Sequence, residues 1–217
     1  MRRTVAWGVV CCAGLAAMLC MSVATAQSAN TALVLDKGWQ FRQAPAGSGA
    51  SDGGWLPATV PGDVHLDLLA NKRIPDPFFR DNEAKLQWIQ DASWEYEVSF
   101  DAPATLMGRA NVDLVFDGLD AAAEVYVNDA KVLDANNMFR VWRVPVKANL
   151  RAGKNVLRVV FPSPITAAEK VAATDPWQPK TKTAAKTYIR KAAYEYGWDW
   201  GPTFVTSGIW RPVRIEA

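Results

Sequence analysis

The stretch SWEYEVSF, residues 93–100, alternates polar and apolar side chains at every position. In an extended strand the apolar set shares one face, and this set is Trp94, Tyr96, Val98 and Phe100. Such alternation is typical of an antiparallel sheet with one buried and one hydrated face. The stretch therefore predicts a sandwich or barrel of antiparallel strands.

Similar short segments recur on both sides of this strand. They lie at residues 32–35, 39–42, 55–58, 112–116, 124–127, 131–133, 141–146, 155–161 and 210–217. The turn residues Asn128-Asp129-Ala130 predict a tight hairpin between two of them. This spacing favours an all-β, jelly-roll type of β-sandwich. Strand–helix–strand alternation is absent from the sequence, which disfavours an α/β fold.

The sequence also predicts a few short helices. One covers residues 63–70 with Asp63 as its cap, a second covers 82–90, and a third begins at Ser163-Pro164 and runs to about residue 173. Residues 174–191 are polar and rich in lysine, and we interpret them as a solvated loop rather than a binding patch. Residues 47–54 are expected to form a small surface loop.

The first residues have the pattern of an export signal. Arg2 and Arg3 precede an almost wholly apolar run over residues 5–23, and Ala24-Thr25-Ala26 supplies a small-x-small cleavage motif. We expect a signal peptide at residues 1–26, cleavage before Gln27, and one β-sandwich domain over 27–217. The protein is then exported, to the periplasm or the extracellular space. An uncleaved membrane anchor and a lipid anchor at Cys20 are the alternatives.

Composition excludes several classes of function. All three cysteines lie in the predicted signal peptide, so no disulfide or thiol chemistry is expected after cleavage. The 24 basic residues fall to 22 when Arg2 and Arg3 are removed, against 22 acidic ones. A balanced charge recruits neither nucleic acid nor an anionic membrane. His65 is the only histidine, and no phosphate-binding glycine loop occurs, so we expect no metal and no cofactor.

Two pairs of acidic residues are candidates for hydrolytic chemistry, which needs two positioned carboxylates. These pairs are Asp81 with Glu83 and Glu195 with Asp199. Neither spacing is distinctive, because acidic residues in loops are usually only solvated. His65 lies beside apolar residues, and a histidine at the edge of the core or on the surface is favoured over a member of a catalytic triad.

The densest cluster of unusual residues is YGWDWGP, residues 196–202. Glycine, proline and aspartate in this order predict an irregular loop. The indoles of Trp198 and Trp200 can stack on the C–H faces of sugars, and Asp199 can accept hydroxyl hydrogen bonds. The alternative is a tryptophan plug that closes one end of the sandwich, with Asp199 capping the local backbone. Residue chemistry alone does not separate the two interpretations.

A set of motifs resembles the N-terminal domain of β-mannosidases in glycoside hydrolase family 2. The motifs are WLPATVPG (55–62), IPDPFFRDNE (74–83), WEY (94–96), VND (127–129), NMF (137–139), IRK (189–191) and YGWDWGP (196–202). The resemblance extends over about residues 35–217, and the WDWGP run points to the mannosidase branch.

The resemblance implies a galactose-binding-like jelly roll and the hydrolysis of terminal β-D-mannosides with retention. In the family both catalytic glutamates lie on a TIM barrel that follows this domain. No catalytic residue is therefore expected in this chain, and the Asn82-Glu83 pair is not expected to be catalytic. Trp198 and Asp199 correspond to residues that contact the terminal mannosyl unit, whereas Arg190 and Lys191 are expected to brace the loop.

The implied partners are the remaining glycosidase domains, including the TIM barrel, and the terminal mannosyl sugar. Two other functions stay open from the sequence. The alternatives to a β-mannosidase domain are a stand-alone secreted carbohydrate-binding module and a non-functional truncated fragment.

Overall fold

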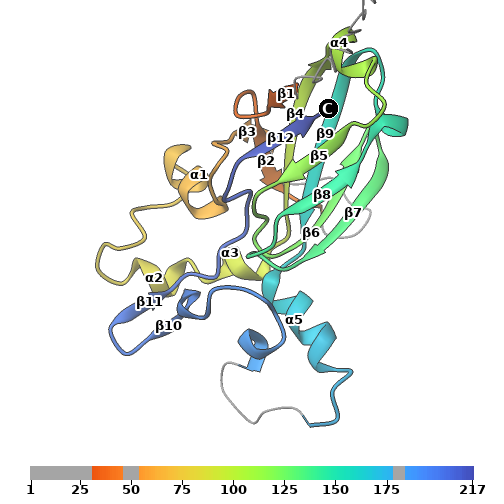
Figure 1. Cartoon of the computed structure of the whole chain (residues 1–217). Helices are drawn as coiled ribbons and strands as arrows, with labels where there is room; N and C mark the ends of the chain where they lie inside the picture. The colour runs from red at the N-terminus through yellow and green to blue at the C-terminus, as the bar shows by residue number, and fades with distance from the viewer. Residues whose placement is uncertain (1–30, 46–53, 178–183) are drawn as a thin grey trace, which may run out of the picture.

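Two antiparallel sheets form a β-sandwich in the computed structural model, which describes residues 31–45, 54–177 and 184–217 (Figure 1). The larger sheet has the strand order β3 (Leu56–Pro57), β2 (Gln40–Gln43), β4 (Trp94–Ala102), β9 (Gly153–Phe161), β6 (Ala122–Val127) and β7 (Ala130–Asn136). The smaller sheet has the order β1 (Ala32–Val34), β12 (Val213–Glu216), β5 (Asp113–Phe116) and β8 (Trp142–Pro145). The predicted all-β sandwich is confirmed. The predicted signal peptide and all of loop 47–54 except Gly54 lie outside the described residues.

The longest strands, β4 and β9, form the centre of the larger sheet. Their register runs from Trp94 opposite Phe161 to Ala102 opposite Gly153. The four alternating apolar side chains of β4 are all buried, as the sequence predicts, and Tyr96 is completely inaccessible. On this inner face Tyr96 contacts Phe41 and Phe161, with ring centroids 5.7 and 5.8 Å apart. These aromatic residues anchor the core between the sheets.

The other face of β4 differs from the sequence prediction at one position. Glu95 is buried rather than hydrated. Its carboxylate forms ion pairs with Arg42 of β2 at 2.7 Å and Arg158 of β9 at 3.3 Å. Because each neighbouring strand presents an arginine, the two arginines shield the Glu95 carboxylate from solvent and also neutralise its charge.

The predicted hairpin at Asn128 is confirmed. β6 and β7 are joined by Asn128 and Asp129, which both have positive φ, at 48° and 69°. Asparagine and aspartate tolerate this conformation better than other residues with a side chain. The Asn128 amide also donates to the backbone oxygen of Asn149 and to the side chain of Asn155, both at 2.8 Å.

Helices are short and mostly gather at one end of the sandwich (Figure 1). They are α1 (Val64–Ala70), α2 (Asn82–Lys85), α3 (Trp88–Asp91), α4 (Ala104–Met107) and α5 (Pro164–Ala172), with 3₁₀ turns η1 (Lys147–Asn149), η2 (Ala184–Thr187) and η3 (Ala193–Glu195). The predicted caps are confirmed: Asp63 accepts from the backbone of His65 and Leu66, and Ser163 accepts from Thr166. No helix in the described part of the chain is long and apolar enough to cross a membrane.

The single helix expected over residues 82–90 is wrong. The structure divides it into α2 and α3 at Leu86 and Gln87. Leu86 is buried in the core, and the Gln87 amide donates to the backbone oxygens of Glu83 and Thr203, both at 2.9 Å. Tertiary contacts at the junction therefore replace the continued helical repeat.

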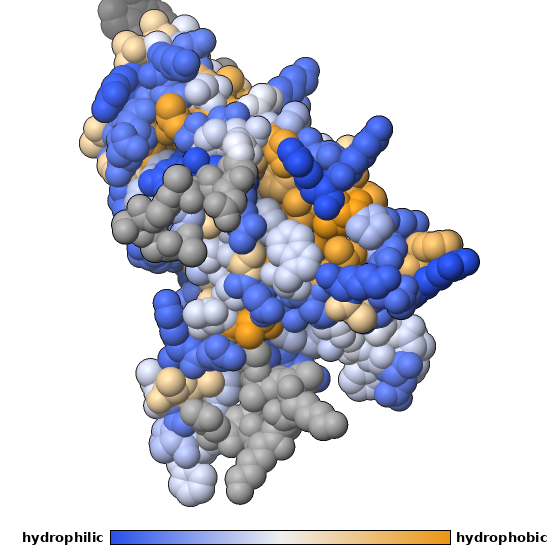
Figure 2. Space-filling model, turned by 180° about the vertical axis from the view of Figure 1, so that it is seen from behind, coloured by the Kyte–Doolittle hydropathy of each residue, from blue (hydrophilic) through white to orange (hydrophobic). Residues whose placement is uncertain are grey.

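Hydrophilic side chains cover most of the surface seen from behind (Figure 2). Apolar side chains gather there in one patch, on the side where α1 lies. Leu66 and Leu69 of α1 are among the exposed apolar residues of the molecule. On this face of the molecule, the largest apolar patch thus lies on the side of α1.

Candidate functional site

The YGWDWGP segment forms a β-hairpin, which corrects the prediction of an irregular loop. Strands β10 (Tyr196–Trp198) and β11 (Gly201–Thr203) pair with Tyr196 opposite Thr203 and Trp198 opposite Gly201. Gly197 has a φ of +79°, and a Cβ atom there would lie 2.4 Å from the Thr203 hydroxyl. Only glycine permits both this conformation and the close approach of the two strands.

Asp199 and Trp200 form the turn at the tip of this hairpin, and the tip is open to solvent. Trp198 is 63% exposed and Trp200 is 85% exposed, with ring centroids 6.2 Å apart and planes at 75°. Asp199 is also exposed, and it has no hydrogen-bond or ion-pair partner among the described residues. These exposures contradict a tryptophan plug with a backbone-capping aspartate. The two predicted site residues, Trp198 and Asp199, lie side by side at the tip.

A cavity of about 460 Å³ opens beside the hairpin. Its aromatic lining residues include Phe78, Trp198, Trp200, Phe204 and Trp210. Three carboxylate residues, Asp63, Asp120 and Glu195, also line it. Sequence reasoning singled out Trp198, Trp200 and Glu195 but missed Phe78, Asp120 and Trp210 as walls, because these come from segments that are far apart in the chain.

The candidate pair Glu195 and Asp199 does not form a matched pair of carboxylates. Glu195 is buried at the base of the hairpin and forms an ion pair with Lys191 at 2.6 Å, whereas Asp199 is exposed at the tip. Burial raises the pKa of the Glu195 carboxyl, and the neighbouring Asp120 carboxylate adds to this effect. The prediction that residues 174–191 are wholly solvated is therefore wrong at Lys191, which is buried.

The candidate pair Asp81 and Glu83 has structural contacts of its own. Asp81 is exposed and pairs with Lys85 at 3.1 Å, one turn along α2. Glu83 accepts a hydrogen bond from the backbone of Thr203 at 2.7 Å, which fastens α2 to β11. Asn82 is buried and donates to the backbone oxygen of Asp76 at 2.8 Å. Of these contacts, the one between Glu83 and Thr203 holds the hairpin against α2.

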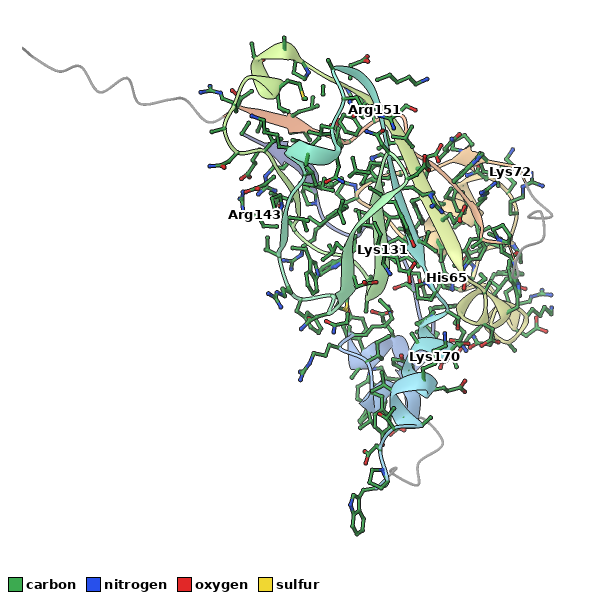
Figure 3. All side chains as sticks on the ribbon, turned by 90° about the vertical axis from the view of Figure 1, so that its right-hand side faces the viewer. His65, Lys72, Lys131, Arg143, Arg151 and Lys170 are labelled. Carbon is green, nitrogen blue, oxygen red and sulfur yellow. The ribbon has the colours of Figure 1, made fainter. Side chains whose placement is uncertain are left out.

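His65 is buried at the edge of the core, as expected from the sequence. Figure 3 shows it on the helical side of the sandwich, away from Arg151 at the opposite end. Its ring meets that of Phe204 edge-on, with centroids 5.5 Å apart. Burial lowers the pKa of His65 to about 4, and the positive charge of Lys191 adds to the shift. His65 is therefore neutral near pH 7. No cluster of three potential metal ligands occurs within the described ranges.

Comparison with known families now bears on this site. The family model "Glycosyl hydrolase 2 galactose-binding domain-like" matches residues 39–211. The chain belongs to this family. The match covers most of the sandwich and the whole of the hairpin.

Proteins named β-mannosidase B are similar in sequence to this chain over most of its length. β-Mannosidase B of Aspergillus terreus is 40% identical over 187 residues, which are 84% of this chain and 22% of that protein. β-Mannosidase B of Thermothelomyces thermophilus is 40% identical over 186 residues, which are 84% of this chain and 21% of that protein. This chain thus spans about a fifth of the length of these relatives.

Solved structures agree with this assignment. The β-D-mannosidase of Dictyoglomus thermophilum matches with a TM-score of 0.80 and 37% identity, covering 85% of this chain and 22% of that one. A β-D-glucuronidase of the same organism matches with a TM-score of 0.53 and 20% identity, covering 86% of this chain and 28% of that one. The second likeness shows the fold alone. This chain is thus homologous to the N-terminal region of β-mannosidases.

Proposed function

We propose that this chain is the N-terminal domain of an exported β-mannosidase, which hydrolyses terminal β-D-mannosides with retention. In this proposal the domain contributes the hairpin tip with Trp198 and Asp199 to substrate binding. The two catalytic glutamates belong to the TIM barrel of the complete enzyme. The observation that carries the proposal is the exposed Trp198-Asp199 tip, whose aspartate has no partner among the described residues, on a domain that is 37–40% identical to β-mannosidases.

The chemistry of the tip suits a pyranose. An exposed indole offers an apolar face to the C–H side of a sugar ring. A carboxylate without a protein partner is free to accept hydrogen bonds from sugar hydroxyls, each contributing about 1.5–3 kcal/mol when charged. The adjoining cavity of about 460 Å³ lies in the size range of small-ligand sites. Aromatic walls and carboxylates together match a ligand with one apolar and one hydroxylated face.

The proposal is tested by the substrate preference of the protein that carries this domain. The nitrophenyl β-mannoside, β-glucoside, β-galactoside and β-glucuronide are assayed in parallel. We expect kcat/KM for the β-mannoside to exceed the others by at least about tenfold. Residues 27–217 alone are expected to give no turnover above buffer. Equal rates on the four glycosides, or turnover by the isolated domain after further purification, would refute the proposal.

Export is tested separately, because it rests on the N-terminal sequence alone. The intact mass of the protein recovered outside the cytoplasm is expected to correspond to a chain that starts at Gln27. A retained Met1 would indicate an uncleaved anchor. A lipid on Cys20 would indicate a lipoprotein. Either result would contradict cleavage before Gln27.

A further inference from the structure

The ammonium group of Lys191 is the positive charge at the centre of the hairpin base, between the carboxylates of Asp120 and Glu195. Its side chain is completely buried. Nζ donates to Asp120 Oδ1, to Glu195 Oε2 at 2.6 Å and to Thr206 Oγ1 at 3.3 Å. An ammonium group has three N–H donors, so all three have an acceptor. All hydrogen-bond donors of the Lys191 ammonium group are thus paired inside the protein, and the group is not solvated.

The backbone around Lys191 is fixed to the sandwich. Met138, in the segment that follows β7, donates its backbone N–H to the oxygen of Arg190 at 3.0 Å. The backbone N–H of Ala192 donates to the Met138 sulfur at 3.0 Å. Asp120 lies between β5 and β6, and its backbone pairs with that of Gly208. Hydrogen bonds therefore fasten both the main chain around Lys191 and its first carboxylate partner, Asp120, to neighbouring segments of the domain.

The other two partners of Lys191 lie at the two ends of the hairpin. Glu195 directly precedes β10, and Thr206 follows β11 closely. The two residues are also joined to each other, because the Thr206 backbone N–H and hydroxyl meet Glu195 Oε2 at 3.0 and 2.8 Å. The Thr206 hydroxyl lies 2.5 Å from Asp120 Oδ2 as well. One ammonium group therefore connects both ends of the hairpin to the sandwich.

We infer that Lys191 is a positioning residue, which sets the orientation of the Trp198-Asp199 tip toward substrate through Glu195 and Thr206. This inference rests on the proposed function of the tip. Lys191 itself is buried and does not touch substrate. If its ammonium group is lost, two buried carboxylates lose their counter-charge, and the hairpin base must separate or take up water to compensate. A small rotation at the base is enlarged at the tip, where an error of about 1 Å can cost about a hundredfold in rate.

The test uses the complete enzyme that carries this domain and three substitutions at the base. Lys191→Met removes the ammonium group and is expected to lower kcat/KM for a β-mannoside by about a hundredfold. Thr206→Val keeps the side-chain shape and removes only the hydroxyl group, so it is the variant to use if Lys191→Met does not fold. We expect it to lower kcat/KM by about tenfold. Thr206→Ser keeps the hydroxyl group and is the matched control, expected within about twofold of the native enzyme.

A purely structural role of Lys191 is distinguished from a positioning role by repeating Thr206→Val in an Asp199→Ala background. If Lys191 acts through the tip, Thr206→Val costs less than about twofold once Asp199 has been removed. An equal loss in both backgrounds, or no loss in the native background, overturns the inference while the effect of Asp199→Ala itself remains. If Asp199→Ala alone has no effect, the proposed function fails, and the positioning role for substrate fails with it. The two failures are thus distinguishable.

Discussion

On the inner face of the larger sheet, Phe41, Tyr96 and Phe161 are fully buried, and the Tyr96 ring contacts the other two rings. At the hairpin end the buried groups are charged, and Lys191 is enclosed by Asp120 and Glu195. The sandwich interior depends on apolar area, which needs no particular direction. The hairpin base depends on matched donors and acceptors, which fix one geometry. Stability and the placement of the candidate site therefore have different physical sources in this domain.

The largest expected effect comes from the sandwich interior. Phe161→Ala removes a fully buried ring and is expected to lower the free energy of unfolding by about 3–5 kcal/mol. In a domain of this size each kcal/mol corresponds to about 2–4 °C in Tm. The matched control is Trp200→Ala at the hairpin tip, which is 85% exposed and is expected to change stability by less than about 0.5 kcal/mol. Thermal and urea unfolding measure both, and equal losses would remove the distinction between the regions.

A smaller effect is expected where the two regions meet, at His65. Its pKa is about 4 in the folded protein and about 6.5 in the unfolded chain, so protonation favours unfolding. The stabilising contribution is fully present above pH 6.5 and is lost as the pH falls toward 4. At pH 4.5 the native protein should have lost about 2.5 kcal/mol through this group.

The pH effect is isolated by comparison with His65→Gln, which does not titrate. Urea unfolding is measured for both proteins at pH 7.5 and pH 4.5. The native protein is expected to lose more stability than the variant between these values. Asp63 and Lys191, the charged groups nearest to His65, are present in both proteins and largely cancel. Identical pH profiles would show that His65 is not held neutral by its surroundings.

The sandwich and the hairpin end also differ in how well the sequence predicts their structure. The alternation of β4 and the turn at Asn128 are local signals, and both predictions are confirmed. The prediction at Glu95 is wrong because its partners, Arg42 and Arg158, lie on other strands. The sandwich is thus predictable wherever a residue's environment depends on its own strand.

The limit of prediction from sequence is clearer at the hairpin end. Glycine and proline in residues 196–202 predict a loop, but the pairing of Tyr196 with Thr203 makes it a hairpin. Composition alone indicates that Lys191 is solvated, and only the family resemblance implies that it braces the loop, because two of its acceptors, Asp120 and Thr206, are 71 and 15 residues away. The spacing of four residues between Lys191 and Glu195 was the one local signal of this network. Long-range polar contacts of this kind leave almost no pattern in the chain.

The smallest effect on stability, and the most direct test of the account, is expected from Asp199→Ala in the complete enzyme. The carboxylate is exposed and has no partner among the described residues, so Tm is expected to change by less than about 2 °C. If Asp199 binds sugar hydroxyls, kcat/KM for a β-mannoside should fall by at least about tenfold, since about 1.36 kcal/mol corresponds to one decade. A large loss of Tm with unchanged kcat/KM would contradict the account, because it would make the hairpin tip a structural element and not a part of the substrate site.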